Sequence, residues 1–151
     1  MDIESIKKRV FECLDFEDND LPFVTIILNK YFKRNPIDIC WGLRRCVFVF
    51  KNYVIKVPIN YNGVRDNDWE GSISDLGPDI NDISYPKTKL AYPKVKNSYI
   101  PIVFMEYVKW ATTKEIKEKL GYYPDWIGYV DCGQVGFTKS GRLVAFDYGI
   151  S

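Results

Sequence analysis

The end of the chain holds the residue pattern that most directly indicates chemistry. Two apolar, strand-like segments, 133–137 and 142–149, flank a turn at 139–141, where glycine accepts positive φ at little cost. Asp147 stands at the end of the second segment and is followed closely by Gly149. A carboxylate in this position can direct an oxygen toward a metal ion, although similar short runs also end ordinary strands. We therefore expect a closing β-hairpin with a candidate metal-binding carboxylate.

The absence of histidine from the 151 residues restricts the chemistry available to the protein. It excludes triad hydrolases and histidine-based acid–base catalysis, so carboxylates, Lys, Tyr or Cys would have to act instead. The cysteines show no Cys-x-x-Cys spacing, and no histidine could complete a zinc site, so we expect structural thiols in a reducing compartment. The cysteines are Cys13, Cys40, Cys46 and Cys132.

Composition and charge narrow the class of protein. The length of 151 residues suits one domain, and 46% apolar with 27% charged residues is typical of a soluble globular chain. A net charge of +1 offers no electrostatic support for binding nucleic acid or a membrane. No apolar run approaches membrane-spanning length, and the acidic start does not suit a signal peptide. We expect a single cytoplasmic domain over residues 1–151.

The first 35 residues are predicted to be a helical extension. Apolar residues recur at helical spacing over 2–14 and again over 20–32. The acidic run between them, 15–20, lacks the glycine and the closing Glu of an EF-hand loop. A solvated linker is the expected structure for that run.

From Ile37 onward the periodicity becomes that of β-strands. Strands are predicted within 38–50 and over 53–59. A tight turn at Lys51-Asn52 should join the strand that ends at residue 50 to the strand over 53–59. The segments 87–95 and 99–108 are further strand candidates with prolines at their margins. The polar region between these pairs of segments contains a predicted short helix over 64–76.

The last third is predicted to form short helices before the closing hairpin. Thr112-Thr113 should cap a helix over 114–120 that Gly121 ends, and Pro124 should begin a helical turn over 124–130. The predicted fold class is α+β. Its parts are a helical extension (1–35), an antiparallel sheet of about five strands with one packed helix (36–108), and an abbreviated floor of short helices and a hairpin (109–151).

Five features occur in an order that resembles the protein-kinase-like fold. They are a glycine on a strand, a lysine on a strand, a glutamate in the next helix, an apolar strand that ends in an acidic–aromatic pair, and the closing hairpin. The resemblance covers about residues 38–150 and is strongest to short kinase-like proteins of bacteriophages. The corresponding residues are Gly42, Lys56, Glu70, Met105-Glu106-Tyr107, and Gln134 with Asp147.

The resemblance implies a nucleotide site. The segment VIKVP is similar to the strand motif whose lysine grips nucleotide phosphates, so Lys56 would take that role and Glu70 would hold it in an ion pair. The segment FMEYV is similar to the hinge whose backbone reads adenine, which assigns Glu106 and Tyr107 to nucleotide binding together with Gly42. The implied ligand is Mg-ATP.

The metal and catalytic positions match the family less well. The segment FDYG resembles the metal-binding Asp-Phe-Gly, so Asp147 would hold Mg²⁺ together with Gln134, which replaces the family's Asn. Tyr129 takes the place of the catalytic Asp and cannot act as a carboxylate base, while Asp131 is displaced by two residues. The sequence stops soon after Gly149, so we expect no activation segment and no large helical lobe.

The glycine-rich loop is also reduced, because only Gly42 remains in WGLRRCVF. Few backbone N–H groups would then be available to cradle phosphates. The missing catalytic Asp and the missing substrate lobe favour a protein that is not an enzyme.

Three functional hypotheses follow. The first is a pseudokinase that binds a protein partner, such as a phage-encoded inhibitor or modulator of a host protein in the host cytoplasm. The second is an active minimal phosphotransferase or nucleotidyltransferase that uses Mg-ATP, with Asp131 as a displaced base. The third is an unrelated α+β interaction module with exposed tryptophans as anchors. The tryptophans are Trp41, Trp69, Trp110 and Trp126.

Overall fold

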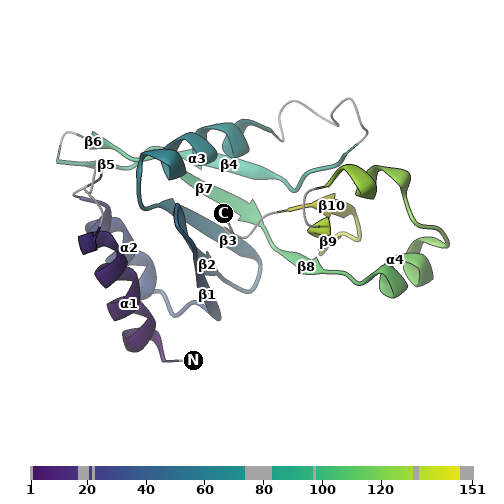
Figure 1. Ribbon diagram of the computed structural model, residues 1–151, viewed down its shortest axis with the longest axis horizontal. Coiled ribbons are helices and arrows are strands. Elements are labelled where there is room, and N and C mark those ends of the chain that lie inside the picture. Colours follow the sequence, from purple (N-terminus) through teal and green to yellow (C-terminus); the bar gives the residue numbers. More distant parts are fainter. Residues whose placement is uncertain are drawn as a thin grey trace.

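The computed structural model describes residues 2–16, 21, 23–73, 83–96, 98–130 and 133–146. Within these residues the architecture is α+β, with four α-helices and a five-stranded antiparallel sheet (Figure 1). The prediction of an α+β chain with a sheet of about five strands is confirmed. None of the helices in the described part of the chain is long and apolar enough to cross a membrane.

The main sheet has the strand order β1-β2-β3-β7-β4, and every neighbouring pair is antiparallel. Helix α3 (Tyr61–Ile73) connects β3 to β4, and β7 is inserted between those two strands. This crossover places the helix beside the centre of the sheet. The strands are β1 (Asp38–Trp41), β2 (Arg45–Val49), β3 (Tyr53–Pro58), β4 (Thr88–Ala91) and β7 (Ile102–Glu106).

The two predicted strand segments before and after residue 97 are each divided in the structure. Along the chain, β4 and β7 are separated by a small hairpin of its own, formed by β5 (Lys94–Val95) and β6 (Ser98–Tyr99). Pro93 and Pro101 lack backbone N–H groups, so neither can continue a hydrogen-bonded ladder. A single strand over 87–95 or over 99–108 was therefore too long a prediction.

The helix predicted over 64–76 begins three residues earlier, at Tyr61. The Asn60 side chain accepts a hydrogen bond from the backbone N–H of Gly63 at 2.9 Å and so caps the first turn. The sequence prediction overlooked this cap. Residues 74–76 lie outside the described residues.

Two N-terminal helices, α1 (Ile3–Phe16) and α2 (Val24–Phe32), cover the face of the main sheet opposite α3 (Figure 1). The helix α1 extends two residues beyond its prediction, into the predicted linker. The helix α2 starts later than residue 20, because the proline at position 22 disfavours helical backbone in the residue before it. The rest of the predicted linker, 17–20, lies outside the described residues.

Alternation along β3 separates the two faces of the sheet. Ile55 and Val57 pack with α1 and α2, whereas Val54 and Lys56 face the side of α3. The buried Phe48 of β2 lies in the first of these cores, with its ring centroid 5.0 Å from that of Phe32. The N-terminal extension is thus an integral layer of the fold.

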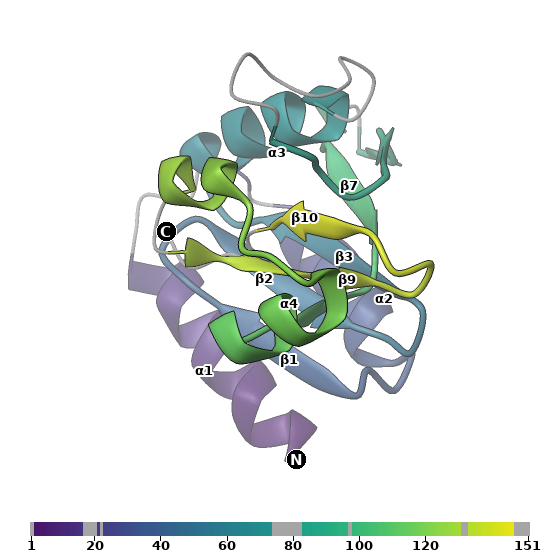
Figure 2. The same ribbon diagram turned by 90° about the vertical axis from the view of Figure 1, so that its right-hand side faces the viewer.

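The last third of the chain forms a smaller part at one end of the main sheet (Figures 1 and 2). It combines a three-stranded sheet of order β10-β9-β8 with the helix α4 and a 3₁₀-helix. The predicted closing hairpin is confirmed by the antiparallel pairing of β9 with β10. The elements are β8 (Val108–Trp110), α4 (Thr113–Leu120), the 3₁₀-helix (Asp125–Tyr129), β9 (Val135–Thr138) and β10 (Leu143–Ala145).

The cap predicted for α4 is present. Thr112 and Glu115 form a reciprocal capping box, and Gly121 ends the helix in the left-handed conformation with φ of 80°. Both signals are local, which is why the sequence alone could locate this helix.

Candidate functional site

The structure brings Lys56 and Glu70 together, as the sequence resemblance implied. Lys56 lies in the centre of β3 and its side chain has 0% exposed surface, while Glu70 projects from α3 with 16% exposed. The ammonium and the carboxylate form an ion pair. A third member, Arg45 of β2, forms a second ion pair with the same carboxylate and is also buried. Two buried cations therefore share the Glu70 carboxylate.

Sequence reasoning missed Arg45, although a signal was present. Arg45 alternates with Val47 and Val49 along β2, and both valines lie in the core on the α3 side of the sheet. The side chain of Arg45 therefore had to face that same side. Only the crossover of α3 shows which carboxylate it meets there.

The two cations determine the protonation of Glu70. Burial by itself raises the pKa of this carboxyl, but the charges of Lys56 and Arg45 and the hydrogen bonds that they donate outweigh burial and hold the pKa below its ordinary value. The carboxylate therefore remains ionised at neutral pH.

Asn67, one helical turn before Glu70, fastens α3 to the sheet. Its side-chain amide is fully buried and donates hydrogen bonds to the backbone carbonyls of Lys56 at 3.0 Å and Pro101 at 2.9 Å. Its oxygen accepts from the Arg45 guanidinium at 3.4 Å. The buried charges are thus part of a polar network that holds the helix in place.

This burial has a direct chemical consequence. Because the Lys56 side chain has no exposed surface, a phosphate oxygen cannot contact its ammonium in the observed conformation. In this conformation the lysine therefore acts in packing and ion pairing.

The turn between β1 and β2 contains Gly42, to which the resemblance assigned nucleotide binding. The N–H of Gly42 donates to the carbonyl of Arg45 at 3.0 Å and closes a two-residue turn, so this N–H is not available for a phosphate. The carbonyl of Leu43 accepts from the Asn60 amide at 2.6 Å, and that of Arg44 accepts from the N–H of Ile59 at 2.9 Å. These bonds hold the turn against the start of α3.

The contact of this turn with α3 requires glycine at position 63. A Cβ atom there would lie 2.1 Å from the carbonyl oxygen of Arg44. We expect Gly63→Ala to lower the free energy of unfolding by about 1–3 kcal/mol, because this clash outweighs the better helix propensity of alanine. Urea denaturation would measure the change. Gly128→Ala is the control, since nothing lies within 4 Å of its Cβ, and equal losses in both variants would contradict the contact.

The hinge-like segment after β7 is bonded within the protein. The N–H of Glu106 donates to the carbonyl of Lys87 at 3.0 Å, and the N–H of Tyr107 donates to the carbonyl of Asn52 at 3.2 Å. The Glu106 carboxylate accepts from the N–H of Lys87 at 2.9 Å and from Arg142 of the closing hairpin at 2.6 Å. Neither N–H is available as a donor to an adenine ring.

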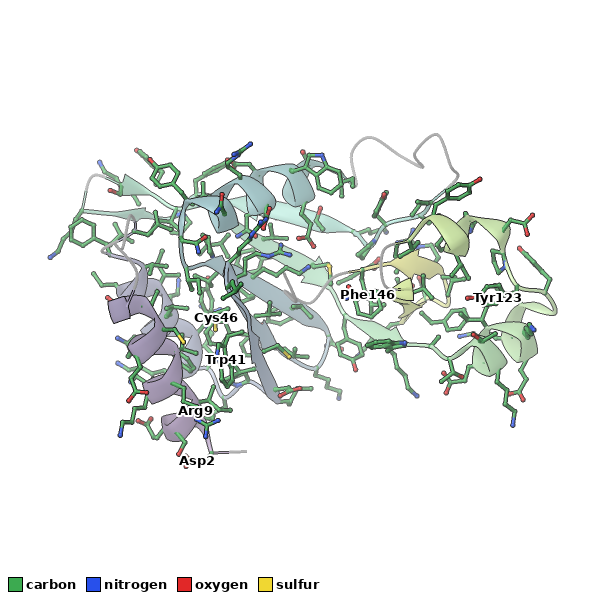
Figure 3. All side chains as sticks on the ribbon, viewed as in Figure 1. Asp2, Arg9, Trp41, Cys46, Tyr123 and Phe146 are labelled. Atoms are coloured by element: carbon green, nitrogen blue, oxygen red, sulfur yellow. The ribbon has the colours of Figure 1, made fainter. Side chains whose placement is uncertain are left out.

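The sheet face beside this segment is filled by the closing hairpin. Val47, Val54 and Met105 of the main sheet are at most 1% exposed, and Val144 and Phe146 of the hairpin pack against this cluster. Figure 3 shows Phe146 at the junction between the main sheet and the smaller part of the molecule. Side chains of the protein therefore occupy the surface on which the resemblance would place a nucleotide base.

The structure describes only some of the residues to which the resemblance assigned metal binding or catalysis. Asp131 and Asp147 lie outside the described residues, so their roles stay predictions. Gln134 is half-buried directly before β9, and its backbone carbonyl accepts a hydrogen bond from the N–H of Phe146 at 2.9 Å. Tyr129 is exposed at the end of the 3₁₀-helix. Within the described residues, no group of three or more His, Cys, Asp or Glu side chains could hold a metal ion.

The described cysteines are free thiols that differ in burial. Cys13 is exposed, Cys40 is half-buried and Cys46 is buried. Burial raises the pKa of the Cys46 thiol, with the neighbouring Cys40 adding to the effect, and burial also raises the pKa of Cys40. Both thiols therefore remain protonated at neutral pH, which makes them poor nucleophiles. Cys132 lies outside the described residues.

Comparison of the chain with models of protein families, with curated proteins and with solved structures gave no match.

Proposed function

We propose that this protein is a kinase-like pseudokinase domain that acts by binding a protein partner. The observation that carries the proposal is the complete burial of Lys56 in its ion pair with Glu70. A lysine in this state stabilises the domain and is not positioned to grip a nucleotide. If a bacteriophage encodes the chain, the domain would inhibit or modulate a host protein in the host cytoplasm.

Two features support the kinase-like part of the proposal. Three consecutive antiparallel strands lead into α3, and two further strands complete the sheet. The lysine of the third strand meets the glutamate of that helix. This is the arrangement that the order of motifs in the sequence implied.

Three further features support loss of nucleotide binding. The β1–β2 turn is bonded to the start of α3. The backbone N–H groups of Glu106 and Tyr107 are engaged by carbonyls of the protein. Val144 and Phe146 fill the adjoining face of the sheet. Each of these three places is thus taken by an internal contact.

Thermal unfolding with and without Mg-ATP tests the proposal. We expect no change in Tm at millimolar nucleotide for the wild type or for Lys56→Met, which shortens the side chain by one atom and removes its charge. Ligand at a hundred times its Kd would stabilise the fold by about 2.7 kcal/mol, which shifts Tm by several degrees in a domain of this size. A Mg²⁺-dependent rise in the wild type that is absent in Lys56→Met would overturn the proposal.

Such a rise would favour the alternative, an active minimal phosphotransferase or nucleotidyltransferase. The retained Lys56–Glu70 pair is the observation in its favour. In that case we expect Asp131→Asn to lower turnover by about 10²–10⁴-fold while nucleotide affinity stays nearly unchanged. Steady-state kinetics and a nucleotide-binding titration would measure the two effects, and unchanged turnover would remove Asp131 from the mechanism.

A further inference from the structure

The outer side of α3 presents exposed residues of a kind usually found in protein interfaces. Tyr61, Arg65 and Trp69 are spaced four residues apart, which places them in a row along one side of the helix. The side chains of Tyr61 and Trp69 are 60% and 65% exposed, and Arg65 is exposed between them. We refer to Tyr61, Arg65 and Trp69 as the α3 stripe.

A third aromatic residue extends this surface. Tyr92, directly after β4, is 52% exposed, and its hydroxyl donates a hydrogen bond to the carboxylate of Asp68 on α3 at 3.1 Å. The helix beneath is held rigidly, because Asn67 and Glu70 on its inner side are bonded to the sheet. The stripe is therefore displayed on a fixed support and would lose little conformational entropy on binding.

Arg65, in the middle of the stripe, has no carboxylate partner among the residues that the structure describes. Asp66 pairs with Arg44 at 3.4 Å, and Asp68 accepts the hydrogen bond from Tyr92. Arg65 forms no ion pair or hydrogen bond with any side chain in the described part of the chain. An exposed guanidinium thus stands between two exposed aromatic rings, one turn away on either side.

We propose that the α3 stripe docks an acidic segment of a partner protein. A carboxylate of the partner pairs with Arg65, and apolar side chains beside that carboxylate pack on Tyr61 and Trp69. Guanidinium is complementary to carboxylate in charge and in its fork of donors. Tyr, Trp and Arg are also the residues most enriched among those that dominate binding energy. This inference rests on the proposed function in protein binding and identifies the surface that performs it.

Selection from a random peptide library tests the docking surface. The library is displayed to the immobilised wild type, to Arg65→Glu and to Trp69→Ala. We expect the wild type to enrich peptides with Asp or Glu beside apolar residues and Arg65→Glu to enrich Lys or Arg at the same position. Trp69→Ala should bind the peptides selected by the wild type at least about tenfold more weakly.

The matched control is Tyr122→Ala, which removes an aromatic ring of similar exposure (63%) from the other end of the molecule and should leave the selection unchanged. Equal Tm values for all variants would verify that each one folds. Absence of acidic enrichment in the wild type, or the same peptides from the wild type and Arg65→Glu, would overturn the inference.

The outcomes separate this inference from the proposed function. Acidic peptides that bind Trp69→Ala as tightly as the wild type would overturn the α3 stripe as the docking surface but leave binding of a protein partner standing. Stabilisation by Mg-ATP would overturn the pseudokinase proposal without bearing on the stripe.

Discussion

Glu70→Gln should lower the free energy of unfolding by about 3–5 kcal/mol, because it leaves the buried cations Arg45 and Lys56 without their shared counter-charge. Lys56→Met should cost much less, since Glu70 keeps its ion pair with Arg45 and the apolar replacement fills most of the same space. Urea denaturation at neutral pH would measure both changes. Equal losses in the two variants would contradict the shared role of the carboxylate.

The exposed pair Lys114–Glu118 provides the control for this prediction. Its side chains are 85% and 65% exposed, and its closest N–O distance is 3.8 Å. Removing the charge by Glu118→Gln should change stability by less than about 0.5 kcal/mol, because solvent screens such pairs. Burial, and not the formation of an ion pair as such, is expected to set the size of the effect at Glu70.

The effect of Glu70 should also depend on pH. The folded-state pKa of this carboxyl lies below its ordinary value of 4.5. Its contribution to stability is therefore fully present above that ordinary value and is lost as pH falls through the lowered folded-state pKa. We expect the difference in unfolding free energy between the wild type and Glu70→Gln to be constant near neutral pH and to shrink in acid. A difference that grows in acid would contradict this assignment.

Phe48→Ala should lower the free energy of unfolding by about 3–5 kcal/mol, because it opens a cavity between the main sheet and the N-terminal helices. Phe48 is fully buried, and its ring meets that of Phe32 edge-to-face at 5.0 Å and that of Tyr31 at 5.8 Å. Chemical denaturation would measure the loss. A double-mutant cycle with Phe32→Ala should give a coupling of about 0.5–1.5 kcal/mol between the two rings.

Trp69→Ala is the control for the aromatic core, because it removes a larger ring from an exposed position. Its effect on stability should stay within about 0.5 kcal/mol. A loss at Trp69 as large as that at Phe48 would mean that Trp69 is needed for folding, and its use as a binding probe would then fail. The difference between the two variants thus measures how much the packing of α1 and α2 on the sheet contributes to stability.

The Lys56–Glu70 ion pair would have a catalytic role in an enzyme and a structural role in a protein that acts only by binding. In phosphoryl transfer a lysine of this kind must meet the phosphates, whereas the Lys56 side chain has no exposed surface in the observed conformation. A buried pair resists the loss of one partner, because the other charge is then left uncompensated. This gives a physical reason for the presence of both Lys56 and Glu70 that does not depend on nucleotide binding.

The sequence by itself determined the class of the fold and most of its elements. Local signals were sufficient for α4, where Thr112 and Gly121 mark the two ends, and for the closing hairpin with its glycine turn. Period-two alternation identified the strands, and the resemblance to the kinase-like fold implied that Lys56 and Glu70 would meet. These features depend on residues near one another in the chain or on a pattern that the sequence displays directly.

Only the tertiary structure decided what covers each face of the sheet and which groups share the buried charge. Arg45 reaches Glu70 because α3 crosses back over the sheet, and Arg142 reaches Glu106 because the closing hairpin returns to the end of β7. Alternation shows that two residues share a face but carries no information about the element packed against it. That choice depends on contacts between distant segments, and it determines that Lys56 is buried while Trp69 is exposed.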